Sequence, residues 1–229
     1  KGATPGTPNP AAVNIDRALA LLEYFTSDYA NALQHINAAI EVTRSSSPVS
    51  LAGTLLLRGR IELAQGDALR AAETFRESER LFVENGRDAH AQRWYAAGLA
   101  GIARARVGDV EAGDAALADA LEKLSGDSKH LGLEQIDLAL YAGAAARRRG
   151  DVAAALVLHR RAADAQKQIS WLGELGQAWV DAELFEDGRL PEADAEAREQ
   201  SLSRAQSSRM ILERIAPNDP RLTELSTNP

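Results

Sequence analysis

The 229-residue sequence contains no cysteine. Disulfide bonds, thiolate metal sites and cysteine nucleophiles are therefore all excluded. The same absence leaves the compartment open, because a cysteine-free chain suits both oxidising and reducing surroundings. We expect a cytoplasmic location, with the periplasm as the alternative.

Aromatic residues and long apolar runs are also scarce. Aromatics make up 5% of the chain whereas hydrophobic residues make up 45%, so the core must be built mainly from Ala, Leu, Val and Ile. Small side chains allow helix axes to approach closely, and this composition gives no support for a β protein. No apolar run approaches the roughly 20 residues of a membrane span, so no membrane insertion is expected.

Basic residues are outnumbered by acidic ones. The chain has 26 Lys and Arg against 33 Asp and Glu, for a net charge of −7. A nucleic-acid binder needs a basic surface, so this balance argues against that class. Residues 1–10 lack an initiator Met and are rich in Pro, Gly and Thr, which we interpret as a linker in a chain excised from a longer protein.

A Gly-Asp pair recurs at Gly66, Gly108 and Gly150 between segments with helical periodicity, and Ser27-Asp28 and Asp187-Gly188 stand in the corresponding places. The turn residues are Ser27, Gly66, Gly108, Gly150 and Gly188, with spacings of 39, 42, 42 and 38 residues. Glycine can adopt the left-handed conformation that ends a helix. The following Asp can accept hydrogen bonds from the free N–H groups of the next helix. Each pair therefore predicts the turn of a helical hairpin.

Five hairpins follow from these turns and indicate a solenoid. They cover about 11–45, 48–85, 88–125, 129–168 and 169–216, and residues 217–229 are expected to form a frayed tail. Small residues recur at matched places on both helices. Seven residues before the turn stand Ala20, Gly59, Gly101 and Gly143, with Asp181 as the exception, and five after it stand Ala32, Ala71, Gly113, Ala155 and Ala193. Such columns predict close packing of the paired helices.

The same columns carry a resemblance to a known family. The residues that match its pattern are Gly59, Gly66, Ala71 and Phe75, then Gly101, Gly108, Leu117 and Ala120, then Gly143, Gly150, Ala155 and Ala162. On these residues the chain resembles the tetratricopeptide repeat (TPR) family over roughly residues 11–215. The period exceeds the usual 34 residues and is similar to the long-period variety in kinesin light chains and in bacterial regulators and kinases. The resemblance implies an all-α fold, a right-handed α-α superhelix of five TPR-like helical hairpins.

No catalytic pattern is present. The four histidines are scattered without an H-x-x-x-H pair, and no phosphate-binding glycine loop occurs. His159 stands where other hairpins have Ile36 and Phe75, so we interpret it as a packed or half-buried residue. We expect no enzyme, no metal site and no cofactor.

The resemblance implies a concave groove lined by the first helix of each hairpin. The candidate partner-binding residues there are Arg17, Tyr24, Arg60, Tyr95, Arg106, Arg147 and Arg148. Arginine offers a planar fork for carboxylates and tyrosine a rigid apolar surface. We hypothesise that this groove binds a protein or peptide through an acidic or C-terminal segment. The arginines at helix ends have a second interpretation, because cations there complement the helix dipole.

Three functions remain open from the sequence. The first is a non-catalytic protein- or peptide-binding scaffold, as a regulatory or sensor module of a larger bacterial signalling protein. The second is a homodimerisation module, because the last helix presents Leu202, Met210, Ile211 and Ile215 with no following unit to cover them. The third is the small-molecule-sensing domain of a transcriptional regulator.

Overall fold

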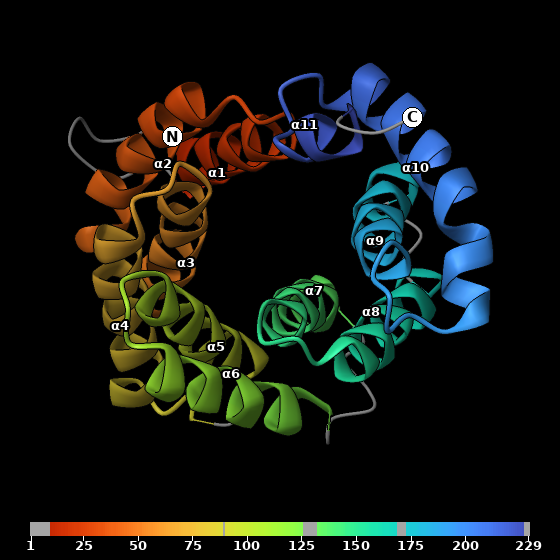
Figure 1. Cartoon of the computed structure of the whole chain (residues 1–229). Coiled ribbons are helices and arrows are strands. Elements are labelled where there is room, and N and C mark those ends of the chain that lie inside the picture. Colours follow the sequence, from red (N-terminus) through yellow and green to blue (C-terminus); the bar gives the residue numbers. More distant parts are fainter. Residues whose placement is uncertain (1–9, 89, 126–131, 169–172, 227–229) are drawn as a thin grey trace. The chain divides into compact units, whose positions relative to one another are not determined.

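The computed structural model describes residues 10–88, 90–125, 132–168 and 173–226 (Figure 1). These residues form eleven α-helices and no strand, which confirms the expected all-α class. The chain divides into two compact units, residues 1–113 and 114–229. None of the described helices is long and apolar enough to cross a membrane.

Unit 1 consists of helices that pack in the order of the chain. They are α1 (Pro10–Phe25), α2 (Tyr29–Arg44), α3 (Pro48–Ala64), α4 (Ala68–Glu84), α5 (Ala91–Arg106) and the beginning of α6 (Val110–Ser125). Helix α1 packs on α2 and α3 packs on α4, while α2 also contacts α3 and α4 contacts α5. Consecutive hairpins therefore stack on one another, as the repeat predicts.

Unit 2 continues the same pattern. It contains the remainder of α6, then α7 (Leu133–Arg148), α8 (Val152–Gln166), α9 (Gly173–Gly188), α10 (Ala195–Ile215) and α11 (Arg221–Ser226). Helix α7 packs on α8, α8 on α9 and α9 on α10. Helix α11 lies against both α9 and α10.

The predicted turn chemistry is present between the paired helices. Gly66, Gly108 and Gly150 have φ angles of +88°, +104° and +81°. The Asp67 carboxylate accepts a hydrogen bond from the backbone N–H of Arg70 at 3.2 Å, and Asp151 caps α8 in the same way. The left-handed glycine ends one helix and the Asp cap begins the next within three residues, which makes the two helices antiparallel.

The close packing predicted for the paired helices is present at three glycines. A Cβ atom placed on Gly59 would lie 2.5 Å from the Phe75 ring, and one on Gly113 would lie 2.5 Å from the backbone oxygen of Gly101. A Cβ on Gly143 would overlap the His159 ring. Any larger side chain at these positions would force the paired helices apart.

The fifth hairpin departs from the prediction. The turn expected at Asp187-Gly188 was wrong, because α9 continues through Gly188 and α10 begins only at Ala195. Gly188 packs against the backbone of Ala197, and Asp187 is fully buried. Asp194 provides the cap instead, accepting a hydrogen bond from the Ala197 N–H at 2.9 Å.

The frayed tail expected after residue 216 was also wrong for residues 217–226. Helix α11 forms there, and Leu225 and Asp219 are each only 5% exposed. The indole N–H of Trp179 on α9 donates a hydrogen bond to the Asp219 carboxylate at 3.2 Å. The guanidinium of Arg221 lies 5.5 Å from the centre of the same Trp179 ring system. The tail is therefore anchored to a residue far back in the chain.

Asp181 occupies the column that holds small residues in the other hairpins. It is 9% exposed, and its carboxylate accepts a hydrogen bond from Gln177 at 3.0 Å. Burial raises the pKa of Asp181, and the hydrogen bond from Gln177 and the charge of Arg204 offset that rise only in part. The buried carboxylate is thus a source of instability whenever it is ionised.

The first prediction concerns the turn between α1 and α2, where Ser27 adopts a φ of +61°. A residue with a Cβ loses roughly 1–2 kcal/mol in this left-handed conformation. We expect Ser27→Gly to raise the free energy of unfolding by about 0.5–1 kcal/mol after allowing for the greater freedom of glycine in the unfolded chain. The matched reverse change, Gly66→Ser in the next hairpin, should lower it by a similar amount. Chemical denaturation tests both; a less stable Ser27→Gly variant would contradict the strain argument.

The second prediction follows from Asp181. Its folded-state pKa is raised, so the folded protein binds the proton more tightly than the unfolded chain, and stability is lost as the pH rises through that pKa. We expect Asp181→Asn to unfold at a higher temperature than the wild type at neutral pH. The difference should narrow in acid, where the wild-type carboxyl is already protonated. An Asn variant that is less stable at neutral pH would show that the carboxylate is needed in its ionised form.

Candidate functional site

Three of the predicted groove residues come together in unit 1. The guanidinium carbon of Arg60 lies 4.6 Å from the ring centre of Tyr24 and 5.8 Å from that of Tyr95. These residues belong to α3, α1 and α5, the first helices of three consecutive hairpins. Arg60 is 7% exposed and Tyr95 is 2% exposed. The cation is thus held between two aromatic faces, an arrangement that favours a guanidinium in a desolvated position.

Arg17 lies two helical turns before Tyr24 on the same side of α1. Its Nη2 atom would be 3.4 Å from a Cβ placed on Gly53 of α3, and Oε1 of Gln92 on α5 would be 3.8 Å from that Cβ. Among the residues that the structure describes, none forms a hydrogen bond or ion pair with the half-buried Arg17 side chain. Burial accordingly lowers the pKa of Arg17. A partly desolvated cation is left available to an anion from outside the chain.

Arg106 serves a helix end, although not its own. Its Nη1 donates a hydrogen bond to the backbone oxygen of Leu63 at 3.0 Å. Leu63 lies in the last turn of α3, where backbone carbonyls lack partners within the helix. Arg106 therefore interacts with a helix end, as the second interpretation of these arginines proposed, but the helix that it caps is α3 rather than its own α5.

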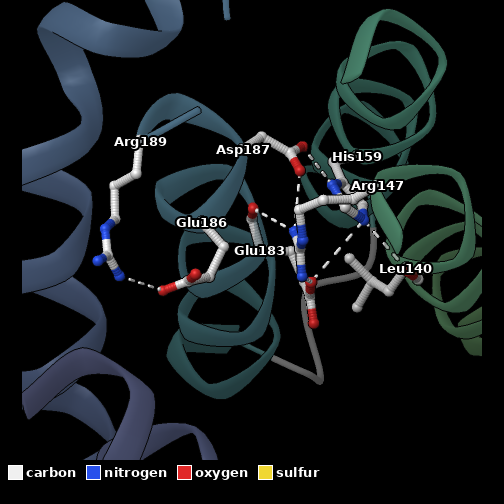
Figure 2. A network of polar contacts seen from close by, with 7 residues as sticks. All are labelled: Leu140, Arg147, His159, Glu183, Glu186, Asp187 and Arg189. Atoms are coloured by element: carbon white, nitrogen blue, oxygen red, sulfur yellow. Dashed lines mark hydrogen bonds and ion pairs between the residues drawn. The ribbon is translucent and has the colours of Figure 1, made fainter. Parts of the chain in front are cut away.

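Arg147 in unit 2 has its donors directed at α9 (Figure 2). Nη1 donates to Asp187 Oδ1 at 2.8 Å and to the Glu183 backbone oxygen at 3.1 Å, and Nη2 donates to Glu183 Oε2 at 2.7 Å. Burial lowers the pKa of Arg147, but the carboxylates of Glu183 and Asp187 outweigh it and raise the pKa overall. The Arg147 guanidinium, which we predicted to bind a peptide carboxylate, instead donates its hydrogen bonds to acceptors within the chain. Arg148 lies exposed in the last turn of α7.

His159 on α8 completes this network and confirms the prediction of a packed histidine. It is 0% exposed, with Nδ1 at 2.5 Å from Asp187 Oδ2 and Nε2 at 3.1 Å from the Leu140 backbone oxygen (Figure 2). Both ring nitrogens face acceptors, so the ring makes both hydrogen bonds only when it carries two protons. The network joins α7, α8 and α9.

A cavity of about 460 Å³ lies among α6, α7 and α8 of unit 2. Its apolar walls are Leu117, Ala118, Leu121, Ala142, Ala145 and Leu158, and its charged rim is Asp114, Glu122, Arg149 and Arg161. The volume is in the usual range for small-molecule sites. Arg149 forms an ion pair with Asp114. Two acidic and two basic residues at the rim select no particular charge of ligand.

The exposed face predicted for α10 is only partly present. Leu202 and Met210 are 60% and 67% exposed. Ile211 and Ile215 are half-buried instead. Dimerisation through α10 therefore remains a prediction supported by two of its four residues. Within the described ranges, no group of three or more His, Asp and Glu side chains is placed to hold a metal ion.

Sequence reasoning missed the acidic half of the unit 2 network. Asp187 was assigned to a turn and Glu183 was given no role, whereas both accept hydrogen bonds from Arg147, which lies 36 residues before Glu183 and 40 before Asp187. The only available signal was Gly143, whose missing side chain leaves room for the His159 ring. That signal locates the ring but does not identify its acidic partner.

The third prediction tests whether this network is structural. Removing one partner of a buried ion pair leaves an uncompensated charge, which costs about 3–5 kcal/mol. We therefore expect Asp187→Ala to lower the free energy of unfolding by about that amount. The control is Glu213→Ala, which removes the exposed Arg209–Glu213 pair and should cost only about 0.3–0.5 kcal/mol. Denaturant titration measures both, and equal effects would contradict a structural role for the network.

No protein-family model and no curated protein sequence matches the chain. Solved structures do match it. The apo form of RapI has a TM-score of 0.64 and 13% identity, with 87% of this chain and 70% of RapI covered. BtubC (BKLC) from P. vanneervenii has a TM-score of 0.60 and 18% identity, with 96% and 83% covered.

The TPR-like repeats attributed to a kinesin light chain of Podosopora anserina also match. That structure has a TM-score of 0.54 and 15% identity, with 89% of this chain and 96% of the other covered. At such low identity the likeness concerns the fold alone. Together with the consecutive packed helix pairs, it shows that this chain has a TPR-like helical repeat fold.

Proposed function

We propose that this chain is a non-catalytic protein-interaction module whose unit 1 binds an acidic segment of a partner protein. The binding surface is the side of α1 that carries Arg17 and Tyr24; Arg60 of α3 stacks on Tyr24 but is itself buried, as is Tyr95 of α5. Folds of stacked helical pairs typically serve as protein-interaction scaffolds because they present extended surfaces built from many helices. This general role is the starting point, and the chemistry of unit 1 supplies the partner class.

Arg17 is the observation that carries the proposal. Its side chain is half-buried, its pKa is lowered by that burial, and no described residue compensates its charge. Leaving a cation partly desolvated is unfavourable unless an anion approaches it. A carboxylate can accept two parallel hydrogen bonds from a guanidinium, which makes it the best-matched partner. Arg147, by contrast, already has Glu183 and Asp187.

The stacked residues next to Arg17 suit a peptide rather than a free ion. Arg60 stacks on Tyr24 and lies 5.8 Å from the ring centre of Tyr95, and because Arg60 and Tyr95 are buried, only the half-buried Tyr24 ring is open to a partner. Tyrosine and arginine are the residue types that most often dominate binding energy in protein interfaces. A carboxylate bound at Arg17 would place the adjoining residues of a partner segment near the Tyr24 ring, two helical turns further along α1.

The fourth prediction is that Arg17→Gln weakens binding of acidic peptides by at least about tenfold, or about 1.4 kcal/mol. The probe is an array of acidic eight-residue peptides, each made as the free acid and as the C-terminal amide. Arg76→Gln is the matched control, because Arg76 is an exposed arginine on α4 of the same unit. Circular dichroism checks that both variants fold.

The outcomes separate the alternatives. Loss of binding for Arg17→Gln but not for Arg76→Gln supports the site. Preference for the free acid would identify a C-terminal carboxylate as the ligand, and equal binding of the amide would identify acidic side chains. Failure of every acidic peptide to bind the wild type, or equal binding by both variants, would contradict the proposal.

The cavity of unit 2 supports a second candidate, small-molecule sensing. It has the volume and the apolar walls of a ligand site, but its rim is charge-balanced, with Arg149 already paired to Asp114. It therefore supports a binding role less specifically than Arg17 does. A place in a bacterial signalling protein stays a prediction from the sequence.

A further inference from the structure

Two polar side chains from different helices converge over Gly53 of α3. A Cβ atom placed on Gly53 would lie 3.4 Å from Nη2 of Arg17 on α1 and 3.8 Å from Oε1 of Gln92 on α5. Both polar atoms therefore lie within 4 Å of one point above the glycine. Arg17, Gly53 and Gln92 are all half-buried, and all three belong to unit 1. We call these three residues the Gly53 site.

Gly53 has room for a side chain, unlike the glycines that set the helix spacing. A Cβ atom on Gly59 or Gly113 would approach a neighbouring residue to 2.5 Å, whereas the nearest neighbour of one on Gly53 would be Arg17 at 3.4 Å. That distance is close to ordinary van der Waals contact, so helix packing does not require glycine here. Glycine inside a helix is destabilising relative to alanine, but it allows the backbone to come close to a ligand. Gly53 therefore leaves open the space between the Arg17 and Gln92 side chains.

Neither polar side chain is used within the part of the chain that the structure describes. Among those residues, none forms a hydrogen bond or ion pair with the side chain of Arg17 or of Gln92. The backbone N–H of Gln92 donates to Nδ1 of His90 at the start of α5, so the carboxamide takes no part in that cap. Asp16, the carboxylate next to Arg17 in sequence, is directed at His35 on α2 at 3.2 Å. A donor and an acceptor are thus both available to a ligand at this site.

The two groups suit a ligand that has a carboxylate and an N–H donor side by side. A guanidinium donates to carboxylate oxygens, and a carboxamide oxygen accepts from an N–H. In the last residue of a peptide, the carboxylate and the backbone N–H are both attached to the same Cα atom. In Asp and Glu side chains, additional methylene groups separate the carboxylate from the Cα atom. A free amino acid fits less well, because its ammonium group would bring a second positive charge close to Arg17.

We propose that the Gly53 site binds the C-terminal residue of the partner protein, an inference that rests on the proposed function of Arg17. The terminal carboxylate binds Arg17, and the backbone N–H of the same residue donates a hydrogen bond to Oε1 of Gln92. The Cα atom between them lies over Gly53, where no side chain obstructs it. Gln92 is then the residue that distinguishes a chain end from an acidic side chain, a distinction that Arg17 does not make by itself.

The fifth prediction concerns Gln92. The probe is the tightest binder among the acidic eight-residue peptides, made as the free acid and as an ester analogue in which oxygen replaces the last backbone N–H. We expect Gln92→Met, which keeps the length of the side chain but lacks the amide, to weaken binding of the free acid about three- to tenfold, as for the loss of one hydrogen bond. Gln34→Met is the matched control, because Gln34 is an exposed glutamine on α2 of the same unit.

The ester analogue makes this test specific. It should bind the wild type about three- to tenfold more weakly than the free acid does. Gln92→Met should bind the two peptides equally, because the substitution and the ester remove the same hydrogen bond. Isothermal titration calorimetry measures all four affinities, and circular dichroism checks that the variants fold.

Gly53→Ala adds a second variant with an opposite effect on stability and on binding. Its methyl group would occupy the space between Arg17 and Gln92, so binding of the free acid should weaken by at least about tenfold. Because alanine favours a helix and the site has room for a Cβ atom, the unfolding temperature should rise by about 2–4 °C. A variant that binds like the wild type would overturn the placement of the ligand over Gly53.

The outcomes separate this inference from the proposed function. Binding that requires Arg17 but is unchanged in Gln92→Met would overturn the role of Gln92 and leave the Arg17 site intact. Equal weakening by the ester in the wild type and in Gln92→Met would do the same, as would equal binding of the free acid and the C-terminal amide. Failure of every acidic peptide to bind the wild type would contradict the proposed function itself, and this inference with it.

Discussion

Close approach of paired helices is the constraint on which the rest of this structure depends. Gly59 accommodates the Phe75 ring, Gly143 accommodates His159, and Gly113 meets the backbone of Gly101. Each contact is too short for a Cβ atom, so each pair of helices has one workable spacing and register. Because the spacing is set within each hairpin, the first helices of successive hairpins within a unit present their side chains at regular intervals.

Several first helices carry an arginine, and the residues around each arginine determine its role. Arg147 has two carboxylates and a backbone oxygen of α9 as acceptors, and with His159 it forms a buried hydrogen-bonded network inside unit 2. Arg17 has the same functional group on another first helix, but no described residue compensates it. A paired buried arginine holds helices together, whereas an uncompensated one is suited to an external carboxylate. The two arginines therefore have different roles although each lies on the first helix of a hairpin.

The last hairpin of unit 2 is covered by a further helix, whereas part of the first helix of unit 1 is exposed. Within unit 2, α11 covers the last hairpin through Leu225 and the Trp179–Asp219 hydrogen bond. Within unit 1, Ile15 and Leu22 stand where later helices have fully buried residues, yet each remains 60% exposed. An apolar face in an interface position is suited to another helix.

The sequence by itself determined the features that arise from contacts between near neighbours in the chain. The left-handed turn residues, the Asp caps and the columns of small residues each depend on a few adjacent positions, so periodicity was sufficient to predict the helix pairs and the TPR-like fold. Only the tertiary structure decided the start of α10, the docking of α11, the partners of Arg147 and the isolation of Arg17. Those features depend on residues some 40 positions apart, such as Arg147 with Asp187 and Trp179 with Asp219. The physical reason is that a local pattern specifies where a helix turns, whereas the partner of a charge depends on which helices the fold brings side by side.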